Sequence, residues 1–192
     1  MKEIKILGRG GQGVVSASAV LASAFYLEGY HSHAFPMYGI ERRGGPARSF
    51  VRVDKKEIIR HDQVYSPFVM LVVDLSVLKE EIEKELKTVG LMIVNTTRNA
   101  DEIKKEFKLK DACIVKTLDA TKIALEATGK PFANVALIGA LAGATNMVSL
   151  DSLNLAVAEI WADKGATVIQ SNQLAIKKAY DLMRCEKCRV EI

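Results

Sequence analysis

The sequence predicts an α/β fold, a three-layer α/β/α domain with a mostly parallel, mixed sheet. Three observations predict it: strand-like and helix-like segments alternate through the middle of the chain, a glycine-rich turn joins the first strand to the first helix, and the last third is helical. The chain has 192 residues, of which 49% are hydrophobic, enough for one substantial core. We therefore expect a single domain over residues 1–184, followed by a charged tail over residues 185–192.

The first strand and the first helix are joined by glycines. Apolar residues alternate loosely over Glu3–Leu7 and stop at Gly8, which is typical of a short buried strand that enters a turn. The next segment, Val14–Leu27, has an apolar side and many small residues, which allow a helix to pack closely on a sheet. Gly29 is well placed to end this helix.

The following segments predict a strand and then a hairpin. His31–Phe35 is the candidate second strand, and we expect Pro36 to break it. Ser49–Val53 and Glu57–Arg60 resemble two strands joined around residues 54–56. This hairpin is the reason to expect a mixed sheet.

The rest of the chain alternates and then becomes helical. Short apolar runs predict strands over Met70–Val73, Leu91–Val94 and Ala112–Val115. Further segments predict helices over Val77–Leu86, Asp101–Phe107, Thr121–Ala127, Ala133–Ala144, Leu153–Ala162 and Val168–Arg184. Strands and helices in turn imply helices packed on a largely parallel sheet.

The composition excludes several classes of protein. The net charge of +4, from 27 Lys and Arg against 23 Asp and Glu, is too small to argue for nucleic-acid binding. No apolar run approaches the roughly 18 residues of a membrane span, and the N-terminus lacks the apolar stretch of a signal peptide. Three cysteines, Cys113, Cys185 and Cys188, fit a reducing compartment better than a disulfide framework. We therefore expect a cytoplasmic protein that binds neither nucleic acid nor a membrane.

A glycine loop between the first strand and the first helix is the first candidate site. It matches G-x-G-x-x-G, and its candidate ligand-binding residues are Gly8, Gly10, Gly11, Gln12 and Gly13. Glycines let the backbone turn tightly and expose its amides, and the N-terminus of a helix attracts anions. The alternative is a tight turn that only helps the helix to pack.

A dinucleotide site makes a further demand on this loop. An acidic residue is expected about 20 residues beyond it, at the end of the second strand, to bind the ribose hydroxyls. This chain has His31–Pro36 there, and the next acid is Glu41. The sequence therefore argues against NAD. Gln12, which is unusual in a generic turn, is expected to hydrogen-bond a partner loop or a ligand.

A second, charged segment follows the second strand. Its candidate interface or ligand-binding residues are Tyr38, Gly39, Glu41, Arg42, Arg43, Gly44 and Gly45. Two adjacent arginines can clamp carboxylate or phosphate groups, and the flanking glycines permit close approach. The alternative is an ordinary surface loop in which Glu41 pairs with one of the arginines.

Together the two segments resemble a known family. The pattern Gly8-x-Gly10-Gly11-Gln12-Gly13, followed by Tyr38-Gly39-x-Glu41-x-Arg43-Gly44-Gly45, is similar to the gamma subunit of 2-oxoacid:ferredoxin oxidoreductases. The segment 39–46 is most similar to the pyruvate enzyme. The strands after it and the Ala/Gly-rich helix near residues 134–146 also fit, so the resemblance covers nearly the whole chain.

The resemblance implies that this chain is one subunit of an enzyme complex of anaerobic metabolism. In that family, alpha- and beta-type subunits hold thiamine diphosphate with Mg²⁺, and a ferredoxin-like delta subunit carries 4Fe-4S clusters. The complex converts pyruvate, coenzyme A and oxidised ferredoxin to acetyl-CoA, CO₂ and reduced ferredoxin. The implied partners are the alpha, beta and delta subunits and, through the complex, ferredoxin. Coenzyme A is the implied substrate, and this chain alone holds no cofactor.

The side chains themselves agree with an accessory role. No Ser–His–Asp or Cys–His grouping can be nominated, so we expect no catalytic residue in this chain. His31 and His33 share a strand face and could bind a metal, but ordinary polar residues are the simpler interpretation. Cys185 and Cys188 have half-site spacing, whereas zinc or a cluster needs about four ligands. We therefore expect no metal site in this chain; a site shared with an iron–sulfur partner subunit and a redox disulfide are the open alternatives for the cysteine pair.

We therefore expect a gamma-type subunit whose two loops contact coenzyme A, a partner subunit, or both. Two alternatives stay open. One is a freestanding nucleotide-binding oxidoreductase that uses the glycine loop conventionally, and the other is a purely structural adaptor. The sequence does not specify the 2-oxoacid or the physiological direction of the reaction.

Overall fold

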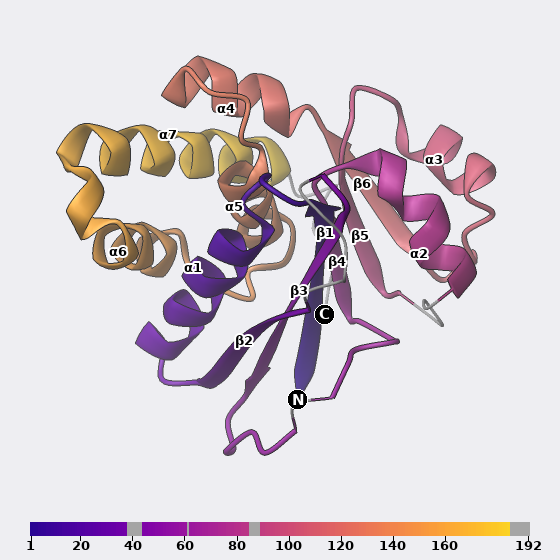
Figure 1. Ribbon diagram of the computed structural model, residues 1–192, viewed down its shortest axis with the longest axis horizontal. Coiled ribbons are helices and arrows are strands. Elements are labelled where there is room, and N and C mark those ends of the chain that lie inside the picture. Colours follow the sequence, from indigo (N-terminus) through magenta and orange to yellow (C-terminus); the bar gives the residue numbers. More distant parts are fainter. Residues whose placement is uncertain (38–43, 61, 85–88, 185–192) are drawn as a thin grey trace.

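A computed structural model describes residues 1–37, 44–60, 62–84 and 89–184 of the chain (Figure 1). Its strands are β1 (Lys2–Arg9), β2 (His31–Met37), β3 (Pro46–Asp54), β4 (Val69–Val72), β5 (Leu91–Asn95) and β6 (Ile114–Leu118). Its α-helices are α1 (Val14–Leu27), α2 (Leu78–Lys84), α3 (Ala100–Glu106), α4 (Ala120–Thr128), α5 (Asn134–Thr145), α6 (Leu150–Ile160) and α7 (Ala166–Met183). Two short 3₁₀ helices, η1 (Leu75–Val77) and η2 (Ala162–Lys164), precede α2 and α7.

The strands form one mixed sheet in the order β2-β3-β1-β4-β5-β6. β3 runs antiparallel to both of its neighbours, β1 and β2, whereas β1, β4, β5 and β6 are mutually parallel. The first strand therefore lies inside the sheet, at the junction of its parallel and antiparallel parts. The expected α/β class and mixed sheet are confirmed.

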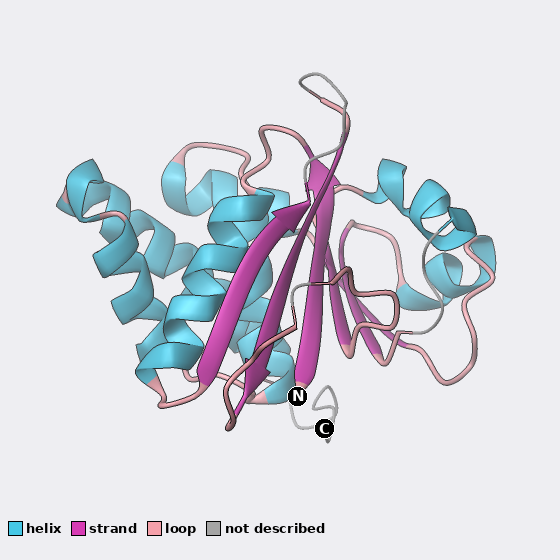
Figure 2. Cartoon of the chain, turned by 60° about the horizontal axis from the view of Figure 1, so that its bottom comes forward, coloured by secondary structure: helices cyan, strands magenta, loops and turns pink. Residues whose placement is uncertain are grey.

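Helices cover the sheet on two sides, which makes three layers (Figure 2). One core cluster joins the sheet to α1, α4, α5, α6 and α7, and a second cluster joins the opposite face to α2 and α3. Along β1 the alternation is clear, because Ile4 and Ile6 belong to the first cluster and Leu7 to the second. On that second side Lys5 is buried against Glu81 of α2, which also accepts from Arg48 at 2.7 Å.

Helix α5 is the most enclosed element, and two glycines explain how it is covered. All its residues from Asn134 to Ala144 are buried. A Cβ on Gly139 would lie 2.3 Å from the carbonyl oxygen of Ile176, and one on Gly143 would lie 2.4 Å from that of Tyr180. Glycine at both positions therefore lets the backbones of α5 and α7 touch.

Two expectations for the antiparallel half were wrong. Strand β2 continues through Pro36 to Met37, because an edge strand has one side without a neighbour and tolerates a proline there. Glu57–Arg60 is not a strand, and β3 pairs instead with β2 and β1. The carbonyl oxygens of Arg60 and Asp62 accept hydrogen bonds from the buried guanidinium of Arg52, which holds this segment against the sheet.

Other helices and strands begin or end a few residues away from the expected positions. The helix expected over Val77–Leu86 begins as η1 and continues as α2, and its last two expected residues lie outside the described residues. The strand expected over Ala112–Val115 is observed as β6, two to three residues later. Helix α6 begins at Leu150, earlier than expected, because the Ser149 hydroxyl accepts from the Ser152 amide and caps it.

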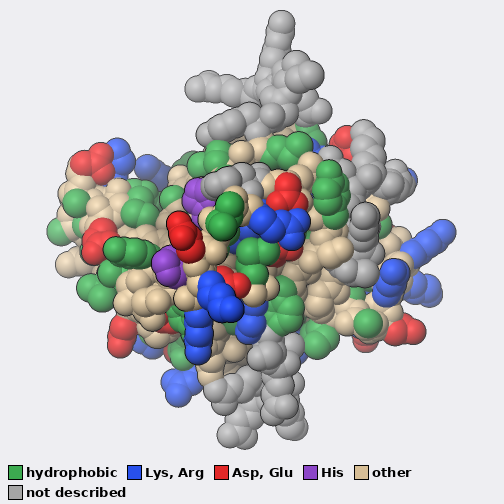
Figure 3. Space-filling view, turned by 90° about the horizontal axis from the view of Figure 1, so that it is seen from below, with side chains coloured by type: hydrophobic (Ala, Val, Ile, Leu, Met, Phe, Trp, Pro, Cys, Tyr) green, Lys and Arg blue, Asp and Glu red, His purple; other side chains and the backbone are tan. Residues whose placement is uncertain are grey.

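The surface carries both signs of charge. On the face seen from below in Figure 3, basic, acidic and apolar side chains are interspersed. Within the described ranges, no helix has the length and the apolar character to cross a bilayer.

Candidate functional site

The glycine loop lies between β1 and α1, as expected, and each glycine meets a different physical demand. Gly11 and Gly13 have φ angles of 96° and 74°, a region that side chains rarely adopt. Gly13 also lies under Asn134, the first residue of α5, whose amide Nδ2 donates to the Gly13 carbonyl at 3.0 Å. A Cβ on Gly8 would lie 2.8 Å from Val14, so this glycine lets β1 and α1 approach each other.

The two motifs meet in space. The amide of Gly10 donates to the Gly45 carbonyl at 2.9 Å, and the Arg9 guanidinium donates to the Gly44 carbonyl at 2.9 Å. Gly44 has a φ of 92°. The other residues expected in the second segment, namely Tyr38, Gly39, Glu41, Arg42 and Arg43, lie outside the described residues.

Gln12 bonds a neighbouring loop of this chain. Its Oε1 accepts from the Arg9 amide at 2.7 Å, and its Nε2 donates to Oδ2 of Asp74 at 2.8 Å. Burial alone would raise the pKa of Asp74, but hydrogen bonds from Ser76 and Gln12 and the charge of Arg9 outweigh it and hold the pKa below its usual value. Asp74 is therefore a stable anion beneath the loop.

These contacts lie where a dinucleotide would bind in a conventional site. In open α/β sheets a ligand enters between two parallel strands whose helices lie on opposite faces. Here those strands are β1 and β4, followed by α1 on one face and α2 on the other. Gln12 and Asp74 bridge the ends of these two strands, and β2 ends at Met37 without an acid. The geometry therefore disfavours a conventional NAD site.

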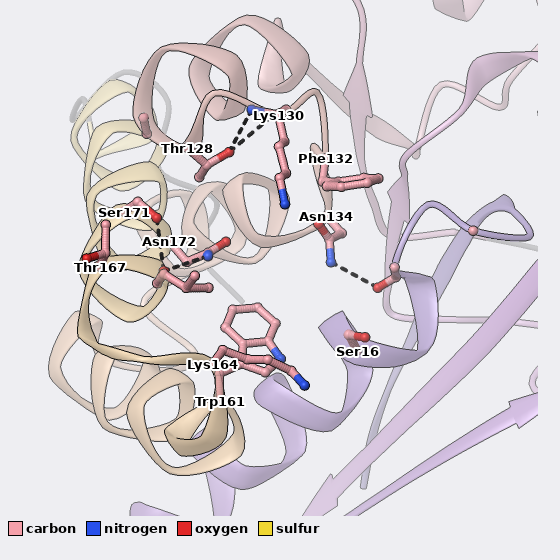
Figure 4. Close-up of a pocket in the computed structure, with 14 residues that line it drawn as sticks. Ser16, Thr128, Lys130, Phe132, Asn134, Trp161, Lys164, Thr167, Ser171 and Asn172 are labelled. Atoms are coloured by element: carbon pink, nitrogen blue, oxygen red, sulfur yellow. Dashed lines mark hydrogen bonds between the residues drawn. The ribbon is translucent and has the colours of Figure 1, made fainter.

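A cavity of about 470 Å³ opens on another flank of the glycine loop (Figure 4). Gly11, Gly13 and Ser16 form one wall, and residues of α4, α7 and the segments around them form the others: Ala127, Thr128, Lys130, Phe132, Asn134, Trp161, Lys164, Thr167, Val168, Ser171 and Asn172. The ammonium groups of Lys130 and Lys164 project into it from different walls, and Trp161 forms its floor in this view.

The electrostatics of this cavity favour an anion. Helix α1 has no side-chain cap and no acidic residue in its first turn. Within the part of the chain that the structure describes, the amides of Gly11 and Gly13 donate to no other group. Lys164 is paired with its neighbour Asp163 at 2.6 Å, so Lys130 is the stronger positive charge here. Free amides, a helix N-terminus and an ammonium group together suit phosphate.

Of the residues that the structure describes, the other candidates do not assemble into a site. Among the described residues, no group of three His, Cys, Asp or Glu side chains could hold a metal ion. His31 and His33 lie on β2, and the cysteine pair at 185 and 188 lies outside the described residues. Cys113 is buried, and burial raises the pKa of its thiol, which makes it a poor nucleophile.

Comparison with known proteins decides the family. The model described as "Pyruvate ferredoxin/flavodoxin oxidoreductase" matches residues 3–182, nearly the whole chain. The chain belongs to this family. Its relatives identify it further as a gamma-type subunit of a pyruvate/2-oxoacid:ferredoxin oxidoreductase, which confirms what the two motifs imply.

Three relatives illustrate the similarity of this gamma-type subunit. The chain is 39% identical over 182 residues to the "Pyruvate/ketoisovalerate oxidoreductases common subunit gamma" of Pyrococcus furiosus, covering 94% of this chain and 96% of the relative. It is 40% identical over 188 residues to the "Pyruvate synthase subunit PorC" of Methanosarcina barkeri, covering 97% and 100%. The crystal structure of pyruvate oxidoreductase subunit PORC from Thermotoga maritima superposes with a TM-score of 0.80 at 31% identity, covering 94% and 95%.

Proposed function

We propose that this gamma-type subunit binds the nucleotide end of coenzyme A for a pyruvate:ferredoxin oxidoreductase complex. The complex would convert pyruvate, coenzyme A and oxidised ferredoxin to acetyl-CoA, CO₂ and reduced ferredoxin. Thiamine diphosphate with Mg²⁺ and the 4Fe-4S clusters would be held by alpha, beta and delta partner subunits in the cytoplasm. Pyruvate is the proposed oxoacid because the relatives from Methanosarcina and Thermotoga are named for pyruvate, although the Pyrococcus relative is named for ketoisovalerate as well.

The observation that carries the proposal is the cavity beside the glycine loop. Coenzyme A ends in an adenosine that carries a diphosphate and a 3′-phosphate. The amides of Gly11 and Gly13 and the ammonium group of Lys130 offer several donors to such phosphates within one cavity. NAD lacks the 3′-phosphate and needs a ribose-binding acid, which no described residue at the end of β2 supplies.

Aromatic side chains in the same cavity suit the base. Trp161 lies along the cavity, and Phe132 stands at its rim with 48% of its surface exposed. An aromatic face beside a phosphate subsite stabilises a stacked purine. Thr128, Ser171 and Asn172 add hydroxyl and amide groups that can bond the base or the ribose.

The second motif would serve the assembly. Gly44 and Gly45 are held against the glycine loop, so whatever contacts one motif lies close to the other. The arginines of this motif, Arg42 and Arg43, with Glu41 to orient them, remain predicted contacts to a partner subunit or to coenzyme A. Tyr38 and Gly39 belong to the same predicted surface.

The experiment measures steady-state kinetics of the reconstituted complex. Replacing Lys130 with Gln should raise the KM for coenzyme A about tenfold, the factor that corresponds to 1.4 kcal/mol of lost phosphate binding, and leave the KM for pyruvate unchanged. The increase should shrink as ionic strength rises. The matched control is Lys105→Gln on α3, the same change on an exposed side chain in the other helical layer.

Two outcomes would contradict the proposal. An unchanged KM for coenzyme A in Lys130→Gln, with the complex intact, would remove the cavity from the coenzyme A site and favour the structural adaptor. Saturable binding of NADH or NADPH by the free chain would favour the freestanding nucleotide-binding oxidoreductase.

A further inference from the structure

Asp74 connects three segments that are far apart in the sequence. It follows β4 and caps η1, where its Oδ1 accepts from the amide and the hydroxyl of Ser76 at 2.9 and 2.5 Å. Its Oδ2 accepts from Nε2 of Gln12 in the glycine loop at 2.8 Å. Both oxygens of the carboxylate are therefore engaged, one by its own turn and one by the loop.

Arg9 extends this network to the second motif. Its Nε and Nη2 donate to the Ser76 hydroxyl at 3.0 and 2.8 Å, and its Nη1 donates to the Gly44 carbonyl at 2.9 Å. Its Nε also lies 3.6 Å from the Asp74 carboxylate. The turn after β4 thus holds the glycine loop directly, and it holds the Gly44–Gly45 segment through Arg9.

We infer that Asp74 is a positioning residue, which fixes the glycine loop in the conformation that presents Gly11 and Gly13 to the cavity. The inference rests on the proposed coenzyme A site for its kinetic consequence, but not for its structural one. Asp74 lines no part of the cavity, so it would act through Gln12 rather than by touching the ligand.

The chemistry of the carboxylate explains why an acid is needed. A carboxylate only accepts, so it requires the NH₂ end of the Gln12 amide to face it. This orientation leaves the Gln12 carbonyl oxygen to accept from the Arg9 amide, the next bond in the network. With Asn in place of Asp74, one oxygen still caps η1, but an NH₂ group then faces Gln12. Either orientation of Gln12 then leaves two donors facing each other.

A pair of substitutions tests this arrangement of donors and acceptors between Asp74 and Gln12. Asp74→Asn alone creates the clash of donors, and Gln12→Glu alone places two carboxylates against each other. Combined, the two changes restore a consistent pattern, because the carboxylate introduced by Gln12→Glu accepts both from the Arg9 amide and from the side-chain amide introduced by Asp74→Asn. The matched control is Asp119→Asn, which changes the cap of α4 after β6, where the carboxylate accepts from the Lys122 amide.

The first readout is amide hydrogen exchange at Gly10 in the full chain, because that amide donates to Gly45 across the two motifs. Each single variant should exchange at Gly10 about tenfold faster, and the double variant should return near the wild-type rate. Asp119→Asn should leave Gly10 unchanged. The inference would be overturned if both single variants exchanged the Gly10 amide at the wild-type rate. It would also be overturned if the double variant exchanged this amide as fast as the faster single variant.

The second readout is the KM for coenzyme A in the complex, compared with kcat. Each single variant should raise this KM severalfold with kcat nearly unchanged, and the double variant should reverse the increase. If Lys130→Gln raises the KM but the single Asp74 and Gln12 variants do not, the network does not position the loop for the ligand and the inference is wrong. If Lys130→Gln has no effect, the proposed function fails, and Gly10 exchange alone decides the role of Asp74.

Discussion

Gly13 shows how one missing methyl group lets two helices begin side by side. A Cβ at this position would lie 2.4 Å from Nδ2 of Asn134, and the φ of 74° is strained for any L side chain. The first demand arises because α1 and α5 converge at the glycine loop, and the second belongs to the turn that enters α1. The motif indicated the glycine correctly, but its neighbour on α5 lies 121 positions further along the chain.

Two glycine variants separate these demands. Gly13→Ala should destabilise the free chain by about 3 kcal/mol, because strain and overpacking add. Gly29→Ala is the matched control, since Gly29 has a φ of 81° and a Cβ there would meet nothing within 4 Å, and it should lose only about 1 kcal/mol. Urea unfolding of both variants gives the difference. Equal losses would show that Asn134 moves aside at no cost.

The lowered pKa of Asp74 predicts a pH dependence of stability. The pKa of its carboxyl group is lower in the folded chain than the usual value of 3.8, so ionisation of Asp74 favours folding. That contribution is complete above the unfolded pKa and is lost as pH falls through the lower folded pKa. The free energy of unfolding of wild type should therefore exceed that of Asp74→Asn at pH 7, and the gap should close below about pH 4. A gap that widens on acidification would contradict the assignment.

At the residue scale, the sequence predicted one half of the candidate site. The glycines and Gln12 were predicted because a dense local motif needs no knowledge of the fold. Asp74, Lys130 and Trp161 were not predicted, since each is an ordinary residue in its own segment. Gln12 and Asp74 are 62 positions apart, and only the parallel pairing of β1 with β4 brings them together.

At the element scale, the strands and helices whose apolar pattern is continuous were predicted best. Helix α1 has the expected bounds, whereas the edge strand β2 and the segment 57–60 do not. Edge strands carry weak patterns, because half of their backbone faces no neighbour and solvent tolerates polar residues and proline there. Some observed helix starts differ from the predicted ones because polar N-caps such as Ser149 and Asn99 determine where a helix begins. These side chains are not part of the apolar pattern from which the helices were predicted.

The link between α2 and the sheet depends on a buried carboxylate. Glu81 accepts from Lys5 of β1 and from Arg48 of β3, and it is 1% exposed. Glu81→Gln should destabilise the chain by about 3–5 kcal/mol, because two sequestered cations lose their shared counter-charge. The control Asp181→Asn breaks an exposed pair with Lys177 on α7 and should lose at most about 0.5 kcal/mol. Chemical denaturation measures both, and similar losses would mean that water reaches Glu81.

At the scale of the whole molecule, we propose that the chain supplies a binding surface and that its partner subunits supply the reaction centre. Its cavity offers amides, hydroxyls, aromatic rings and two ammonium groups. We therefore expect the purified chain neither to decarboxylate pyruvate nor to reduce ferredoxin, and we expect turnover to appear when the partner subunits are added. The assay compares the free chain with the reconstituted complex, and sustained turnover by the free chain would refute this expectation.

The enclosure of α5 has a consequence for synthesis on the ribosome. This helix is apolar on every side, and the helix that covers it, α7, is made after it and after α6. At about 5–20 residues per second, synthesis of α5 is complete a few seconds before that of α7. Until α7 packs on it, α5 exposes apolar surface to which chaperones or other unfinished chains can bind. Docking of α7 is therefore the folding step that removes this apolar surface.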